Sequence, residues 1–153
     1  MRWIIASAIA LFSPDAAAGH DLIMVANTTF GPADYGSVLF DAGSVQATGQ
    51  QRDFWSYMFV RRGADYVRGA NYTEVDCRIG RIRYLKRQMF DASHTEIGEM
   101  DRSTSWSRPP TDSSEERMVR LVCGTEKPTD AEKLGDLDPL TISDALLTNP
   151  KLR

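Results

Sequence analysis

The chain has 153 residues, of which 42% are hydrophobic and 25% are charged, and its net charge is −3. A chain of this size and composition is expected to fold as one globular domain with a sizeable core. The negative net charge argues against a protein whose main partner is nucleic acid, because such proteins concentrate positive charge.

The first 18 residues have the pattern of an export signal and are not expected to belong to the fold. A short positive start precedes an apolar stretch, Trp3 to Phe12, that is too short to span a bilayer. Small residues then suit cleavage after Ala18, and no cysteine follows the apolar stretch that could carry a lipid. We therefore expect 1–18 to be a signal peptide. The mature chain is expected to be periplasmic or secreted, without a membrane span or a lipid anchor.

Apolar runs separated by turn residues predict several strands in the first half of the mature chain. Strands are expected at 21–29, 37–41 and 45–49, with a turn rich in Gly, Pro and Asp at 30–36. The strongest strand covers 52–61, and both of its faces are mostly apolar, which is typical of a central strand. We expect a helix on one face and the C-terminal tail or a partner subunit on the other.

Three aromatic side chains, Trp55, Tyr57 and Phe59, share one face of this central strand. They could be buried beneath the helix or the tail. Alternatively, they could form an exposed aromatic face for a ligand or for a dimer.

Residues 71–87 are interpreted as one long strand with a bulge. The alternation of apolar residues changes phase at Gly80, and a glycine inside a strand pattern often marks a bulge. With one extra residue there, Cys77, Ile79, Ile82 and Tyr84 would all face the core. Four basic side chains would then share the opposite face: Arg78, Arg81, Arg83 and Arg87.

These arginines belong to a basic segment that precedes an acidic one. Residues 52–87 carry nine positive and four negative side chains, a balance of +5. Residues 91–116 carry two positive and seven negative side chains, a balance of −5. The two segments could pair within one sheet, as opposite charges on neighbouring strands do. Alternatively, the arginine face could bind an acidic protein or a glycan; nucleic acid is not an expected partner.

The two cysteines, Cys77 and Cys123, are expected to form a structural disulfide. An even pair in an exported chain is typical of a disulfide, and closing a loop of this length would strongly restrict the unfolded chain. A zinc site needs about four Cys or His ligands. With His20 and His94 the mature chain has only four in all, without local paired spacing. We expect neither a metal nor another cofactor.

A helix is expected from Ser113 to about Cys123, and shorter strands before it at 89–90 and 95–100. Ser113 with Glu116 matches a capping box, and the apolar stripe that follows would end at Gly124. The disulfide would then tie this helix to the sheet. Residues 125–153 contain little that could pack, and we expect them to be a flexible tail.

No catalytic residue is expected. His94 lies near a serine and several acids in sequence, but hydrolase triads are assembled from distant residues, and no nucleophile motif is present. His94 is therefore interpreted as a turn residue. His20 could belong to a copper-binding N-terminus only if cleavage followed Ala17, which suits cleavage less well.

Short motifs around both cysteines carry a family resemblance. They are Tyr72, Glu74, Asp76 and Cys77, then Arg81, Arg83 and Leu85 of the basic strand, then Trp106, and finally Val122-Cys123. Asp41-x-x-Ser44, Val45 and the strand around Trp55 add similar features in the first half. Together these motifs resemble the bacterial surface-adhesin E family over about residues 22–124.

The resemblance implies an α+β domain, expected at 19–124, in which an antiparallel sheet carries a C-terminal helix. It also implies a location at or outside the cell envelope. The adhesin that names the family is an outer-membrane lipoprotein that binds host extracellular-matrix and serum proteins, whereas this chain lacks the lipidation cysteine. We expect an exported, non-enzymatic, adhesin-like protein that binds proteins or glycans. The alternative is a periplasmic structural or stress-related accessory domain without an extracellular ligand.

Overall fold

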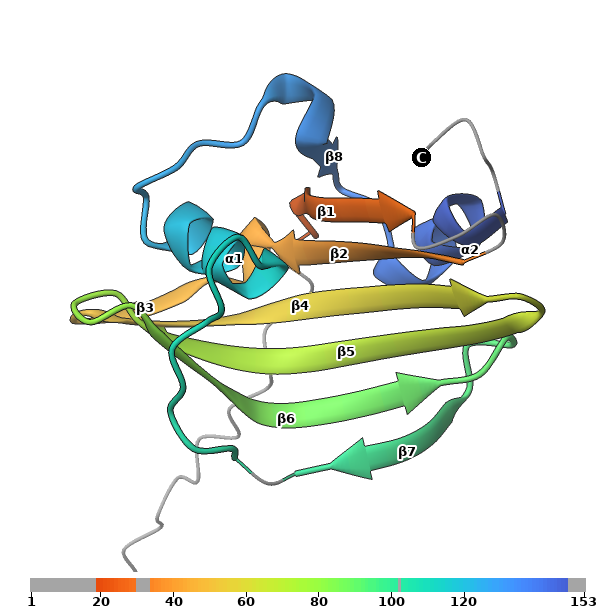
Figure 1. Ribbon diagram of the computed structural model, residues 1–153, viewed down its shortest axis with the longest axis horizontal. Helices are drawn as coiled ribbons and strands as arrows, with labels where there is room; N and C mark the ends of the chain where they lie inside the picture. The colour runs from red at the N-terminus through yellow and green to blue at the C-terminus, as the bar shows by residue number, and fades with distance from the viewer. Residues whose placement is uncertain (1–18, 30–33, 102, 149–153) are drawn as a thin grey trace, which may run out of the picture.

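The computed structural model describes residues 19–29, 34–101 and 103–148. One antiparallel sheet lies at their centre, with the strand order β7-β6-β5-β4-β2-β1-β8 and with β3 beside β4 (Figure 1). The strands are β1 (Leu22–Thr29), β2 (Tyr35–Asp41), β3 (Gln46–Thr48), β4 (Gln51–Arg62), β5 (Asp65–Asp76), β6 (Arg81–Phe90), β7 (Glu96–Met100) and β8 (Lys133–Gly135). The helices are α1 (Ser114–Val122) and α2 (Pro139–Thr148), with short 3-10 turns at Ala42–Ser44 and Asp130–Glu132. The predicted α+β class is confirmed.

The two faces of the sheet are covered by different helices. On one face, Phe54 and Ile82 share a buried cluster with Met118 of α1. On the other face, Phe59 shares a buried cluster with Leu147 of α2. We call these the α1 face and the α2 face, and Figure 1 shows the two helices near opposite ends of β4. The central strand is therefore covered on both sides, as predicted, and the second cover is the C-terminal segment of the chain itself.

The start of α1 is set by its cap. The Ser113 hydroxyl accepts a hydrogen bond from the backbone N–H of Glu116 at 3.1 Å, as predicted for a capping serine. The Glu116 carboxylate accepts from the N–H of Asp112 at 2.9 Å, one residue earlier than a standard capping box requires. The helix ends before Gly124, whose φ of +75° is the left-handed conformation that commonly follows a helix.

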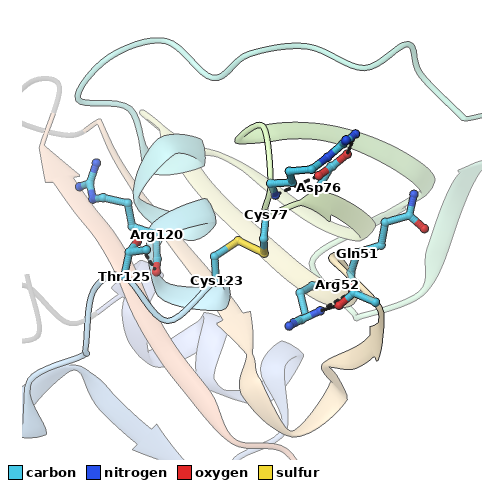
Figure 2. The surroundings of a disulfide bond; sticks show 9 residues. Gln51, Arg52, Asp76, Cys77, Arg120, Cys123 and Thr125 are labelled. Carbon is cyan, nitrogen blue, oxygen red and sulfur yellow. Dashed lines mark hydrogen bonds and ion pairs between the residues drawn. A yellow bond between two sulfur atoms is a disulfide. The ribbon is translucent and has the colours of Figure 1, made fainter.

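The predicted disulfide is present and joins α1 to a turn of the sheet (Figure 2). Cys77 lies directly after β5, and Cys123 caps the C-terminal end of α1. Their Cα atoms are 5.5 Å apart, although 46 positions separate them in sequence. The Cys77 N–H also donates to the carbonyl of Gln50 at 2.9 Å, so Cys77 is held both by the bridge and by the residue before β4.

Residues 71–87 do not form one strand, and that prediction was wrong. β5 ends at Asp76, and the next four residues form a turn. β6 then begins at Arg81 and runs back beside β5. Gly80 has a φ of +62°, which glycine adopts in turns without strain, and its N–H donates to the Asp76 carbonyl at 2.9 Å. Ile79 lies in the turn with 42% of its surface exposed, instead of in the core. The change of phase at Gly80 therefore marks a hairpin.

A bulge does occur, but further along β6. Tyr84 lies opposite Thr73 and Lys86 lies opposite Tyr72, so Leu85 is the extra residue. The alternation of side chains reverses at this position. Tyr84 therefore lies on the α1 face, whereas Lys86 lies on the α2 face.

The segment expected to be a flexible tail is folded over 130–148. β8 pairs with β1, and Leu146 and Leu147 of α2 are 4% and 0% exposed. The guanidinium of Arg68, which is itself buried, donates to the Ser143 hydroxyl at 2.9 Å and to the Asp144 carboxylate at 2.6 Å. The expectation of a loosely attached tail is therefore wrong as far as the end of α2, because apolar and ionic contacts both hold this helix.

Several expectations fall outside the described residues. The predicted signal peptide at 1–18 does so, as do residues 30–33 of the first predicted turn and 149–153 of the tail. Among the helices that the structure describes, none is both long enough and apolar enough to cross a membrane.

Candidate functional site

The four arginines predicted to form one binding face do not lie together. Arg78 is in the turn after β5, and Arg81 and Arg83 lie on the α2 face. Arg87 lies on the α1 face, because the bulge at Leu85 reverses the alternation before it. The structure therefore contradicts a single arginine face, and the reason is that the bulge lies at Leu85.

Two of these arginines are also engaged by other side chains of the sheet. Arg83 donates to the Glu74 carboxylate and lies over the Trp106 ring, with its guanidinium carbon 4.6 Å from the ring centre. Nε of Arg87 donates to the Asn71 side-chain oxygen at 2.8 Å. These guanidinium groups therefore already have partners within the domain.

A hollow of the α2 face lies beside the end of β2. It has a volume of about 410 Å³, and its lining includes His20, Asp41, Ser44, Gln46, Trp55 and Tyr72. A second hollow of about 210 Å³ shares His20 and Trp55 with the first and extends to Pro139 and Leu140 of α2. Small-molecule sites commonly have volumes of about 300–1,000 Å³. We call these two hollows together the Trp55 site.

Two aromatic rings from neighbouring strands form the wall of this site. Trp55 of β4 lies opposite Tyr72 of β5, and their ring centres are 5.3 Å apart at an interplanar angle of 41°. Both residues are half-buried, so each ring is supported by the sheet while part of it remains open to solvent. Such a pair is a rigid apolar surface that also carries polar groups at its edges.

The turn after β2 fixes both Trp55 and a histidine at the edge of the site. The Ser44 hydroxyl accepts from the Trp55 N–H at 2.9 Å and donates to the Asp41 carbonyl at 2.8 Å. The Asp41 carboxylate accepts from the N–H of Gly43 at 3.0 Å and lies 2.7 Å from Nδ1 of His20. Because a carboxylate accepts, Nδ1 of His20 carries the proton in this pair.

A buried carboxylate oxygen lies next to the aromatic pair. Asp53 and Glu74 are opposite each other on β4 and β5, and Oδ1 of Asp53 is buried without a hydrogen-bond partner in the part of the chain that the structure describes. Burial, and then the charge of Glu74, raise the pKa of Asp53, while Arg83 acts to lower it. Burial and the charges of Asp53 and Glu74 also raise the pKa of Tyr72, so its phenol stays protonated as a donor.

The raised pKa of Asp53 predicts that Asp53→Asn stabilises the protein at neutral pH. The folded state holds the Asp53 proton more tightly than the unfolded state, where the pKa is about 3.8, so ionisation costs stability as the pH rises above that value. Asparagine does not ionise and avoids this loss. We expect the variant to melt at a higher temperature than the parent at pH 7, and at a similar temperature at pH 3.

The matched control for this measurement is Asp65→Asn, at the exposed start of β5. We expect it to leave the melting temperature nearly unchanged at both pH values. A melting temperature of the Asp53→Asn variant that is equal to or below that of the parent at pH 7 would contradict the prediction.

The structure also places the other residues that the sequence suggested as candidates. Tyr57 and Phe59 are buried in the cluster that α2 covers, so only Trp55 of the three aromatic residues remains half-open. His94 lies in the turn before β7, as predicted, and its Nε2 is 3.2 Å from the Asp144 carboxylate of α2. Within the described ranges, no group of three or more His, Cys, Asp or Glu side chains could hold a metal ion.

The fold and the site together define a disulfide-bonded α+β domain with a half-open aromatic pair on one face of its sheet. The sequence model of the surface-adhesin protein E family matches residues 28–124, and the chain therefore belongs to this family. The predicted resemblance is thereby confirmed, and the family makes this a surface or exported protein of the adhesin type. Searches of curated proteins and of solved structures found no match.

Proposed function

We propose that the protein is an exported, non-enzymatic adhesin whose Trp55 site holds part of an extracellular partner, either a protein or a glycan. The carrying observation is the half-open pair of Trp55 and Tyr72 beside Oδ1 of Asp53, which has no hydrogen-bond partner among the described residues. Tryptophan and tyrosine are enriched among the residues that dominate binding energy. A buried polar atom without a partner is rare in native proteins, and a ligand would supply one. Family membership supports the adhesin class.

The chemistry of the site supports binding more than catalysis. The Ser44 hydroxyl is held between the Trp55 N–H and the Asp41 carbonyl, so it is not poised as a nucleophile. The acid–histidine pair of Asp41 and His20 lacks a nucleophile bonded to the histidine among the described residues. A nucleophile and its base within hydrogen-bond reach are the usual sign of covalent catalysis.

A binding assay with a matched pair of tryptophan variants tests the proposal. The oxidised protein is passed over immobilised extracellular-matrix and serum glycoproteins, and binding is recorded by interferometry. We expect binding to at least one of them, and Trp55→Ala should weaken it by about 30-fold, since a central aromatic contributes about 2 kcal/mol or more. Trp106 is half-buried too, but it does not line the site, so Trp106→Phe should bind as the parent does.

Protease accessibility on intact cells tests the location separately. An adhesin should be degraded by protease added outside the cells or be found in the medium. Complete protection, with release only after the outer membrane is opened, would contradict the adhesin proposal and favour the periplasmic accessory domain.

A further inference from the structure

Resting on this proposed function, we infer that the Trp55 site recognises a neutral sugar ring, a pyranose unit within a glycan of the partner. The inference names the chemical class of ligand for the two hollows. It replaces the expectation of an acidic partner, because the groups that line these hollows differ from those on the predicted arginine face.

The aromatic wall has the shape and support that a sugar ring requires. One face of many pyranose rings carries mainly C–H groups, and a flat aromatic surface covers such a face with little loss of side-chain freedom. The backbone N–H of Trp55 is anchored to the Ser44 hydroxyl, and Tyr72 lies opposite Trp55 in the central hairpin. The two rings are inclined at 41° to each other, and both line the first hollow, where a sugar ring could lie against them.

The polar groups beside this wall match neutral hydroxyl groups, which both donate and accept. Oδ1 of Asp53 is an acceptor without a hydrogen-bond partner in the described part of the chain, and the protonated phenol of Tyr72 is a donor. The imidazole of His20 adds a further polar group, and the exposed amide of Gln46 can donate or accept. A hydroxyl group that donates to the Asp53 carboxylate would satisfy the buried oxygen with a charge-assisted bond.

The charges around the site disfavour an anionic ligand. Asp41 lines the first hollow, Asp53 is the sheet partner of Gln46 in that lining, and Asp138 lines the second hollow. Two positive groups of the same face already have partners, since Arg83 binds Glu74 and Lys86 lies 3.0 Å from the Glu99 carboxylate. A sulfate, sialic acid or acidic side chain placed here would face the like charges of these aspartates.

The second hollow suggests what the ring carries. Phe90, Ala70 and Leu140 contribute apolar surface to it, next to Trp55. A small apolar substituent, such as the methyl group of an acetamido sugar, or the C–H face of a second ring, fits such a lining. The site therefore suits a neutral oligosaccharide of two or more units.

A glycan array followed by saturation-transfer NMR tests the inference. The array carries neutral, sialylated and sulfated oligosaccharides, and we expect binding to neutral members. In NMR, saturation of aromatic protons should pass to the ring C–H protons of the bound sugar, and Trp55→Ala should abolish this signal. Asp53→Asn should weaken binding by about tenfold, because a charge-assisted hydrogen bond is lost. This variant is expected to be more stable than the parent, so weaker binding would not reflect unfolding.

The outcomes separate this inference from the proposed function. Binding only to anionic glycans, or to no glycan, would overturn the inference. Trp55-dependent binding to a matrix glycoprotein that persists after enzymatic removal of its glycans would also overturn it, while leaving the proposed adhesin function intact. Absence of any Trp55-dependent binding would overturn both.

Discussion

Replacing both cysteines with alanine, Cys77→Ala together with Cys123→Ala, is expected to lower the free energy of unfolding by about 4 kcal/mol. The bridge closes a loop of 46 residues, and cross-linking such a loop removes much of the freedom of the unfolded chain. A loss of this size is a large share of the roughly 5–15 kcal/mol that stabilises a domain. Urea unfolding followed by circular dichroism measures it.

The local structure makes α1 the element most affected. α1 has nine residues, which is too short to be stable alone, and it is held by Met118, Val119 and Leu121 together with the bridge. The control is the parent protein in reductant, which should lose similar stability, while the double variant should not respond to reductant. An unchanged urea midpoint in the double variant would contradict the prediction.

Leu147→Ala is expected to lower the free energy of unfolding by about 3 kcal/mol. Leu147 is fully buried in the cluster that α2 forms with Phe59, Tyr57 and Leu39 of the sheet, so its truncation leaves a cavity. Differential scanning calorimetry measures the change. Hydrogen exchange of the α2 amides, which should become faster, shows whether the helix detaches.

A matched leucine lies just before α2. Leu137 is 44% exposed, and Leu137→Ala should change stability by no more than about 0.5 kcal/mol. Equal effects of the two substitutions would mean that α2 is not docked as the structure shows. Because Pro139 and Leu140 line the second hollow, a detached α2 should also weaken binding at the Trp55 site.

The pairing of Trp55 with Tyr72 could have been predicted by counting residues back along both strands from the turn between β4 and β5. Arg62 and Asp65 are paired across a two-residue turn, and this register places Trp55 opposite Tyr72 and Asp53 opposite Glu74. The sequence reasoning began the second strand at Asn71, so it did not see this register. Gly63, with a φ of +57°, was the available signal, because glycine in this conformation is typical of tight hairpin turns.

Other features could not be predicted from local pattern. The bulge at Leu85 has no glycine and appears only when β6 is paired with β5, and this bulge divides the arginines between the two faces. The docking of α2 depends on Arg68 and on a buried surface built by strands far away in sequence. The cap at Ser113 and the central strand β4 were predictable because each has a strong local sequence pattern. The disulfide was predictable because a pair of cysteines in an exported chain is expected to be oxidised.

The pairing of β1 with β8 has a consequence for the order in which the molecule is completed. β1 is the first described strand, and it lies between β2 and a strand that begins only at Lys133. A chain synthesised from its N-terminus therefore has one edge of β1 unpaired until the last elements follow. During that interval this edge is open to chaperones or to other chains. Synthesis of the C-terminal segment is thus the step that covers this edge of β1.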